Sequence, residues 1–166
     1  MKSIPVGVSV SGKETRVLRL GHGSERSPKR EQNQDAYRVY VDQEAVRTAG
    51  RGAILVVSDG LGGHRAGGDA STMAVDQLWL YFQVPSAQFH PTQTLARLVQ
   101  AANRSIHEMG ARSEAHKRMG ATLSLVLFDA TFSHFMVVHV GDSRIYCVRD
   151  GVVRQVTEDH VDPMDE

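Results

Sequence analysis

The sequence predicts an α+β domain, because stretches with the two-residue period of strands lie at both ends of the chain and two helical stretches lie between them. Its 166 residues suit one domain of ordinary size. The 19 basic and 19 acidic residues balance, so the composition provides no overall field that would attract nucleic acid or an anionic membrane.

The first third of the chain is expected to be mainly β. Alternating valines in residues 6–10 and the apolar positions of residues 15–20 predict a hairpin that turns at Gly12 and Lys13. Residues 21–34 are rich in glycine, serine and charge and predict a loop. Two further strands are predicted, over residues 36–42 and over the apolar run 54–57, which suits burial on both faces.

The middle of the chain is expected to be helical. Apolar side chains recur with helical spacing over residues 70–82, where Asp69 is a candidate cap, and over residues 91–109, which open with Pro91. The remainder predicts a β-meander whose last hairpin turns at Asp150 and Gly151. Its strands are expected at residues 122–128, 133–140, 144–149 and 152–156.

Features of export or membrane insertion are absent from the sequence. The N-terminus has no apolar signal region, and no stretch approaches the roughly 18 apolar residues of a membrane span. The single cysteine, Cys147, lies in an apolar stretch and is expected to be a small core residue. We therefore expect a cytoplasmic protein without disulfides.

A glycine-rich segment follows the predicted buried strand and contains the first candidate site residues. Asp59 and Gly60 come directly after the strand, and four more glycines follow by residue 68. A dinucleotide fingerprint would need glycine where Arg65 stands, and a phosphate loop would need lysine where Asp69 stands. Both nucleotide interpretations fail, which leaves an ion site as the better hypothesis.

Three aspartates stand where a predicted strand meets a glycine or a turn: Asp35, Asp59 and Asp142. Each of them alone is compatible with an ordinary turn aspartate that bonds its own backbone. Together they suit a hard divalent cation such as Mg²⁺ or Mn²⁺, which prefers oxygen ligands. The histidines show no spacing typical of a zinc site.

Four motifs occur in the order Arg30-x-x-Asn33-Gln34-Asp35, Ser58-Asp59-Gly60-Leu61-Gly62-Gly63-His64, Gly120-Ala121-Thr122-Leu123 and His139-Val140-Gly141-Asp142-Ser143-Arg144. In order, spacing and flanking strands they resemble the motifs of the bacterial metal-dependent protein phosphatases of the PPM (type-2C) family. Residues 149–160 are similar to that family's next hairpin, so the resemblance extends from about residue 21 to residue 160.

The resemblance implies an αββα four-layer sandwich with a centre of two Mn²⁺ or Mg²⁺ ions. The residue matching Asp59 bridges both ions, and the carbonyl of Gly60 binds one of them. Asp35 lies close by through water, and Asp142 matches a ligand of a third, weaker metal. Arg30 matches the arginine that binds the substrate phosphoryl group, a role that suits a planar guanidinium.

The implied reaction is hydrolysis of phosphoserine and phosphothreonine in proteins by metal-activated water, without a phosphoenzyme. The partner is then a phosphorylated protein, and the enzyme opposes a serine/threonine kinase. The alternative is a non-catalytic relative that binds phosphoproteins or regulates them. A catalytic role is expected for Arg30 and Asp59.

Two features of the family are missing from the chain. The family has a second Ser-Asp-Gly segment and an Asp-Asn segment, each with a metal-ligand aspartate, and neither occurs here. We therefore expect residues 1–160 to form the N-terminal part of a phosphatase domain, incomplete at its C-terminus, with an acidic tail at residues 161–166. The sheet left uncovered would suit a homodimer or a partner chain.

Overall fold

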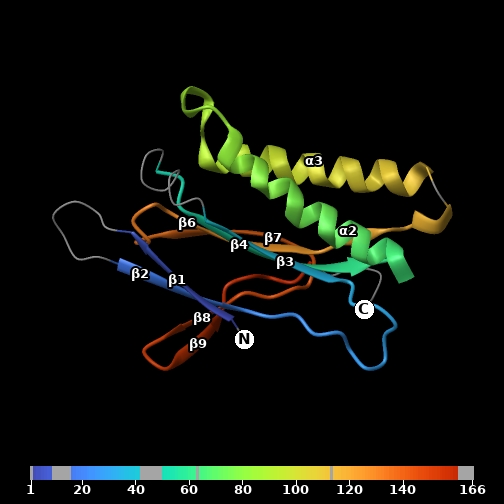
Figure 1. Cartoon of the computed structure of the whole chain (residues 1–166), viewed down its shortest axis with the longest axis horizontal. Coiled ribbons are helices and arrows are strands. Elements are labelled where there is room, and N and C mark those ends of the chain that lie inside the picture. The colour runs from blue at the N-terminus through green and yellow to red at the C-terminus, as the bar shows by residue number, and fades with distance from the viewer. Residues whose placement is uncertain (1, 9–15, 42–49, 63, 113, 161–166) are drawn as a thin grey trace.

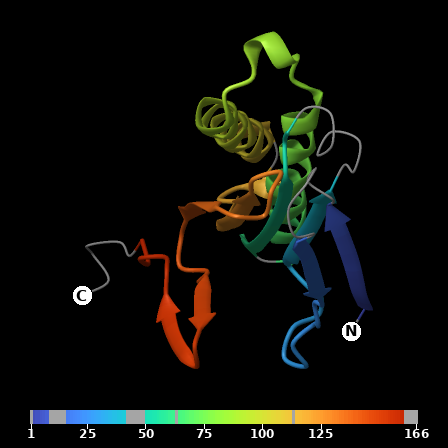
Figure 2. The same ribbon diagram turned by 90° about the vertical axis from the view of Figure 1, so that its left-hand side faces the viewer.

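The computed structural model of the chain describes residues 2–8, 16–41, 50–62, 64–112 and 114–160. A central antiparallel sheet has helices on one face, and two β-hairpins lie on its other side (Figure 1). Figure 2 shows these layers from a direction at right angles to the first. The α+β class predicted from the sequence is confirmed.

The central sheet has the strand order β3-β4-β6-β7, with every neighbouring pair antiparallel. Its strands are β3 (Asp35–Val41), β4 (Ala53–Leu61), β6 (Leu123–Phe128) and β7 (Phe135–Val140), and the short β5 (Gly120–Ala121) pairs with the end of β4. The predicted strands are all present. However, β4 continues four residues beyond the predicted end at residue 57, because Gly60 and Leu61 pair with β5.

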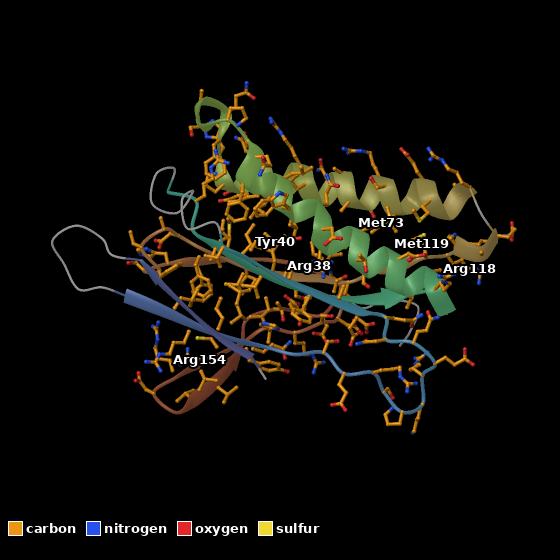
Figure 3. The ribbon with its side chains drawn as sticks, viewed as in Figure 1. Arg38, Tyr40, Met73, Arg118, Met119 and Arg154 are labelled. Carbon is orange, nitrogen blue, oxygen red and sulfur yellow. The ribbon has the colours of Figure 1, made fainter. Side chains whose placement is uncertain are left out.

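Helices α2 (His64–Asp76) and α3 (Pro91–Arg112) cover one face of this sheet (Figure 1). Three short 3₁₀ helices accompany them: η1 (Gln77–Gln83), η2 (Ser86–Gln88) and η3 (Glu114–His116). The core between sheet and helices is apolar and includes Ile54, Val56, Leu78, Tyr81, Leu95, Leu98 and Leu125. Tyr40 on β3 and Met73 on α2 pack against the same core (Figure 3).

The start of α2 differs from the sequence-based expectation. The helix was expected at residue 70 with Asp69 as its cap, yet it begins at His64 and contains Gly67 and Gly68. The carboxylate of Asp69 instead lies within hydrogen-bond distance of Nε2 of His116, at 3.1 Å. A Cβ on Gly67 would lie 2.8 Å from the carbonyl oxygen of Gly60, so this glycine lets the helix approach β4 closely.

The two hairpins on the other side are β1 (Lys2–Val8) with β2 (Arg16–His22), and β8 (Tyr146–Arg149) with β9 (Val152–Gln155). Both were predicted, although the first turn, at residues 12–13, lies outside the described residues, as does most of the loop before β4. The β8–β9 hairpin is largely exposed, and Cys147 in it is half-buried. The expectation that Cys147 is a core residue was therefore wrong.

Side-chain and main-chain hydrogen bonds hold the segment after β9 against the turn that follows β7. Thr157 is buried, and its hydroxyl accepts a hydrogen bond from the amide of Ile145 at 3.1 Å. The guanidinium of Arg144 donates to both carboxylate oxygens of Asp159, and the amide of His160 donates to the carbonyl of Gly141 at 2.8 Å. The predicted acidic tail, residues 161–166, lies outside the described residues.

The described residues thus contain one helical layer, one five-stranded sheet and two hairpins on the other side of that sheet. No helix in the described ranges lies on the hairpin side, so the second helical layer of an αββα sandwich is not represented among them (Figure 2). No described helix is long and apolar enough to cross a lipid bilayer.

Candidate active site

Strand pairing brings the first two predicted site residues together. In the β3–β4 register Asp35 lies directly opposite Asp59. Side chains in such opposite positions project to the same face with Cβ atoms about 5 Å apart. Burial along β4 alternates so that Ser58 and Gly60 face the helices, whereas the side chain of Asp59 is exposed on the other face. The two carboxylates therefore share the face of the sheet that lies away from α2 and α3.

The charge of this pair changes the proton affinity of Asp59. Partial burial, the negative charge of Asp35 and a hydrogen bond with Asp35 raise the pKa of Asp59 above its ordinary value. Asp142 adds to this effect, and Arg30 opposes it. A carboxylate held close to other carboxylates is a place where a cation would be stabilised.

All five predicted site residues line one cleft of about 440 Å³. They are Arg30, Asp35, Asp59, Gly60 and Asp142. Three segments supply them: the loop between β2 and β3, the paired ends of β3 and β4, and the turn after β7. The five residues, which come from segments that lie far apart in the sequence, are therefore close together in the structure.

Arg30 reaches the cleft from an exposed loop. Its amide donates to the carbonyl of Ser27 at 3.0 Å, and the guanidinium of Arg26 donates to its carbonyl. At the end of the loop the side chain of Asn33 accepts a hydrogen bond from the amide of Asp35 at 3.0 Å. These hydrogen bonds stabilise the conformation of the loop that precedes β3.

Gly60 is held by close packing on the helix side of the site. A Cβ on this residue would lie 2.0 Å from the carbonyl oxygen of Gly67 in α2. Its amide donates to the carbonyl of Gln34 at 3.1 Å, and the buried hydroxyl of Ser71 donates to the same carbonyl at 2.6 Å. The end of β4, the loop before β3 and the first turns of α2 are thus joined at Gly60.

Sequence reasoning missed a second group of residues, of which Thr122 is the centre. Its hydroxyl accepts a hydrogen bond from the amide of Asp59 at 2.9 Å and lies 2.6 Å from the hydroxyl of Ser143. Thr122 also lines the cleft. The motif at residues 120–123 marked this position, but nothing in the motif indicates which neighbour a threonine hydroxyl bonds.

The donor set suits a hard cation in part. Two carboxylates side by side and a nearby main-chain carbonyl are oxygen ligands of the kind that Mg²⁺ and Mn²⁺ prefer. Among the described residues no group of three or more His, Cys, Asp or Glu side chains is arranged to hold an ion. The residues present therefore fit one side of a metal centre.

Comparison with known proteins identifies the family. The profile described as protein phosphatase 2C matches residues 22–165. The chain belongs to the protein phosphatase 2C family.

Relatives in this family are protein phosphatases of bacteria. Protein phosphatase PhpP of Streptococcus pneumoniae is 37% identical over 136 residues, which cover 80% of this chain and 51% of PhpP. Serine/threonine phosphatase stp of Listeria innocua is 38% identical over 111 residues, which cover 64% of this chain and 43% of stp. The chain thus spans about half the length of the curated relatives it matches.

Solved structures agree with the phosphatase 2C fold. The serine/threonine phosphatase PstP/Ppp of Mycobacterium tuberculosis matches with a TM-score of 0.65 and 27% identity, over 95% of this chain and 54% of that one. The catalytic domain of PstP in complex with two manganese ions matches with a TM-score of 0.63 and 27% identity, over 95% of this chain and 55% of that one. The family is metal-dependent, and the roles of the five cleft residues in this member stay predictions.

Proposed function

We propose that the protein hydrolyses phosphoserine and phosphothreonine in proteins with the help of Mn²⁺ or Mg²⁺. The observation that supports this most directly is the Asp35–Asp59 pair, which shares one cleft with the guanidinium-bearing Arg30. An acidic pair attracts cations, and an arginine beside it attracts the phosphoryl anion. The non-catalytic alternative is not favoured, because the acidic pair and the arginine line the same cleft.

Each cleft residue has a proposed role. Asp59, the carbonyl of Gly60 and, through water, Asp35 would hold two ions, and Asp142 would serve a third, weaker site. Such ions, when bound, lower the pKa of water and offset negative charge on a phosphoryl group. Arg30 would orient the phosphoryl group by paired N–H donors, and its positive charge would stabilise the charge on the phosphoryl oxygens.

The substrate we propose is a phosphorylated protein made by a serine/threonine kinase, and the place of action is the cytoplasm. The cleft lies at the molecular surface, and Arg30, Asp35 and Asp142 on its walls are exposed. A phosphorylated side chain on a protein surface would therefore reach them without an opening movement of the fold.

We also propose that another polypeptide, either a second copy or a partner chain, covers the hairpin side of the sheet. Large apolar side chains are exposed there, on β4, β7 and the β8–β9 hairpin: Val57, Leu61, Phe135, Tyr146, Val148, Val152 and Val153. Exposed apolar side chains that gather on one side of a protein are typical of a surface that binds another chain. Light scattering tests the second copy, since a homodimer has twice the mass of the monomer and a monomeric mass contradicts a homodimer.

The phosphatase proposal is tested with Mn²⁺-dependent hydrolysis of p-nitrophenyl phosphate and a phosphothreonine peptide. Asp59→Asn should lower the rate by at least about 100-fold, because Asp59 would hold the ions directly and the loss of a group that only supports a metal ligand already costs up to about 100-fold. Asp150→Asn is the matched control, because Asp150 lies in the β8–β9 turn at a φ of 53° that asparagine also adopts. A lack of Mn²⁺ stimulation, or equal rates for wild type and Asp59→Asn, would exclude the proposal.

A further inference from the structure

Thr122 uses every polar group it has to bind its neighbours around the cleft. Its amide donates to the carbonyl of Asp59 at 2.9 Å, and its own carbonyl accepts from the hydroxyl of Ser58 at 2.5 Å. Its hydroxyl accepts from the amide of Asp59 at 2.9 Å. Three hydrogen bonds therefore join Thr122 to two consecutive residues of β4, Ser58 and Asp59.

The remaining contact of Thr122 crosses to another segment. A threonine hydroxyl has one proton and two lone pairs, and here one lone pair takes the amide proton of Asp59. The hydroxyl proton is then available for Ser143, whose Oγ lies 2.6 Å away. This contact links the Asp59 backbone through the Thr122 hydroxyl to Ser143, which follows Asp142 directly.

The methyl group of Thr122 lies beside Gly141 in the same segment. A Cβ added to Gly141 would lie 2.7 Å from Cγ2 of Thr122, and Gly141 has a φ of 103°. Only glycine fits there without strain. The hydroxyl of Ser124, two residues along the chain, donates to the carbonyl of Ser143 at 3.0 Å. Thr122 therefore lies against both neighbours of Asp142: its methyl group is beside Gly141, and its hydroxyl is bonded to that of Ser143.

We propose that Thr122 is the positioning residue of the metal site, whose hydroxyl holds the Asp142 turn in place against the Asp59 strand. The proposal rests on the function proposed above, since it assigns a purpose to a link between two of its metal-binding residues. Asp59 lies on a paired strand, whereas Asp142 lies in a turn and needs a contact of this kind to keep a constant separation from it. Thr122 itself holds no ion in this proposal.

Two substitutions separate the parts of the side chain. Thr122→Val keeps the shape and removes the hydroxyl, and we expect it to weaken Mn²⁺ binding about tenfold, a typical loss for a group that supports metal ligands. Thr122→Ser keeps the hydroxyl and removes the methyl group, and it should retain most of the affinity. Ser143→Ala removes only the crossing bond, so its effect and that of Thr122→Val should not add. Free Mn²⁺ is measured by electron paramagnetic resonance, which does not depend on turnover.

The matched control is Thr157→Val. The hydroxyl of Thr157 also accepts a hydrogen bond from an amide, that of Ile145 at 3.1 Å, but it does not line the cleft. Thr157→Val should lower the unfolding temperature about as much as Thr122→Val does and leave the Mn²⁺ affinity unchanged. Equal loss of affinity in both valine variants would reduce Thr122 to a structural role and overturn the proposal.

Amide hydrogen exchange tests the link with no metal present. Thr122→Val should speed exchange of the Asp59 amide, which donates to the Thr122 hydroxyl, and Thr122→Ser should keep that amide protected. Wild-type protection in Thr122→Val contradicts the proposal whether or not the protein proves to be a phosphatase. A wild type that binds Mn²⁺ with the expected variant effects but hydrolyses no phosphopeptide would reject the proposed function and leave the positioning role standing.

Discussion

Asp35 and Asp59 are direct partners in the β3–β4 register, so two like charges stand opposite each other on one face of the sheet. Like charges in opposite positions destabilise a strand pair. A stability cost of this kind persists at functional sites, where a bound ligand offsets it. The repulsion between Asp35 and Asp59 therefore lowers the stability of the metal-free fold, and a bound cation would offset that loss.

Asp59→Asn should make the metal-free protein more stable at pH 7, by about 0.5 kcal/mol, the scale of one cross-strand pair. The pKa of Asp59 is raised by burial and by Asp35, so the folded state binds the proton more tightly than the unfolded state. Wild type then loses stability as the pH rises from the ordinary value of 3.8 through the raised pKa, and the variant does not. Urea denaturation at several pH values with a chelator present measures the difference.

Mn²⁺ should reverse the order of the two proteins, because a ligand that binds only the folded state stabilises it. Wild type should gain stability on titration with Mn²⁺ and Asp59→Asn should gain little. The control Asp150→Asn should follow wild type at every pH. A metal-free Asp59→Asn protein that is less stable than wild type at pH 7 would show that the carboxylate is satisfied without a cation.

The sequence allowed the site residues to be named but not their contacts. An apolar run before Asp59 and a motif around Asp35 indicate two strands, yet the register depends on how the strands pair, and a one-residue slip would turn one carboxylate to the other face. The sequence marked Thr122 only as part of a motif, because its hydrogen bonds go to residues that are distant in the chain and cannot be predicted from the motif. Hydrophobic periodicity was sufficient for the helix that begins at Pro91, where the core decides the structure.

The start of α2 was misjudged for a related reason. Glycine is intrinsically unfavourable in a helix, by about 1 kcal/mol relative to alanine, so Gly67 and Gly68 predicted a loop. The close approach of α2 to Gly60 overrides that preference. Local propensity and tertiary packing disagree here, beside the candidate site.

Gly60→Ala should destabilise the protein by about 2–3 kcal/mol, in the upper range for overpacking. The new Cβ would lie 2.0 Å from the carbonyl oxygen of Gly67 and 2.8 Å from that of Gln34, so main-chain atoms of two segments must move. Gly120→Ala is the matched control: Gly120 lies on the paired strand β5, and a Cβ there would meet nothing within 4 Å. Thermal unfolding of both variants checks this, and equal losses would mean that contact with α2 is not what requires glycine.

Arg30→Lys should raise the KM for a phosphothreonine peptide about tenfold, because lysine keeps the charge and loses the paired N–H donors. Mn²⁺ binding should change little, since Arg30 would bind the phosphoryl group and not the ions. Arg154→Lys is the control: Arg154 (Figure 3) is exposed on β9 and is not among the residues that line the cleft. Steady-state kinetics with Mn²⁺ present measures the effect, and an unchanged KM would remove Arg30 from the substrate site.

Asp159→Asn should release the segment that follows β9. The guanidinium of Arg144 donates hydrogen bonds to Asp159 and holds the pKa of that carboxyl below its ordinary value. The ion pair therefore favours the docked segment above the ordinary carboxyl pKa, and this contribution is lost as the pH falls through the lowered pKa. At pH 7 the variant should exchange the His160 amide faster, because that amide donates to Gly141 only while the segment is docked. Glu158→Gln removes the same charge from the neighbouring exposed residue and should leave exchange at His160 unchanged; equal acceleration in both variants would assign the effect to net charge and not to the Arg144 contact.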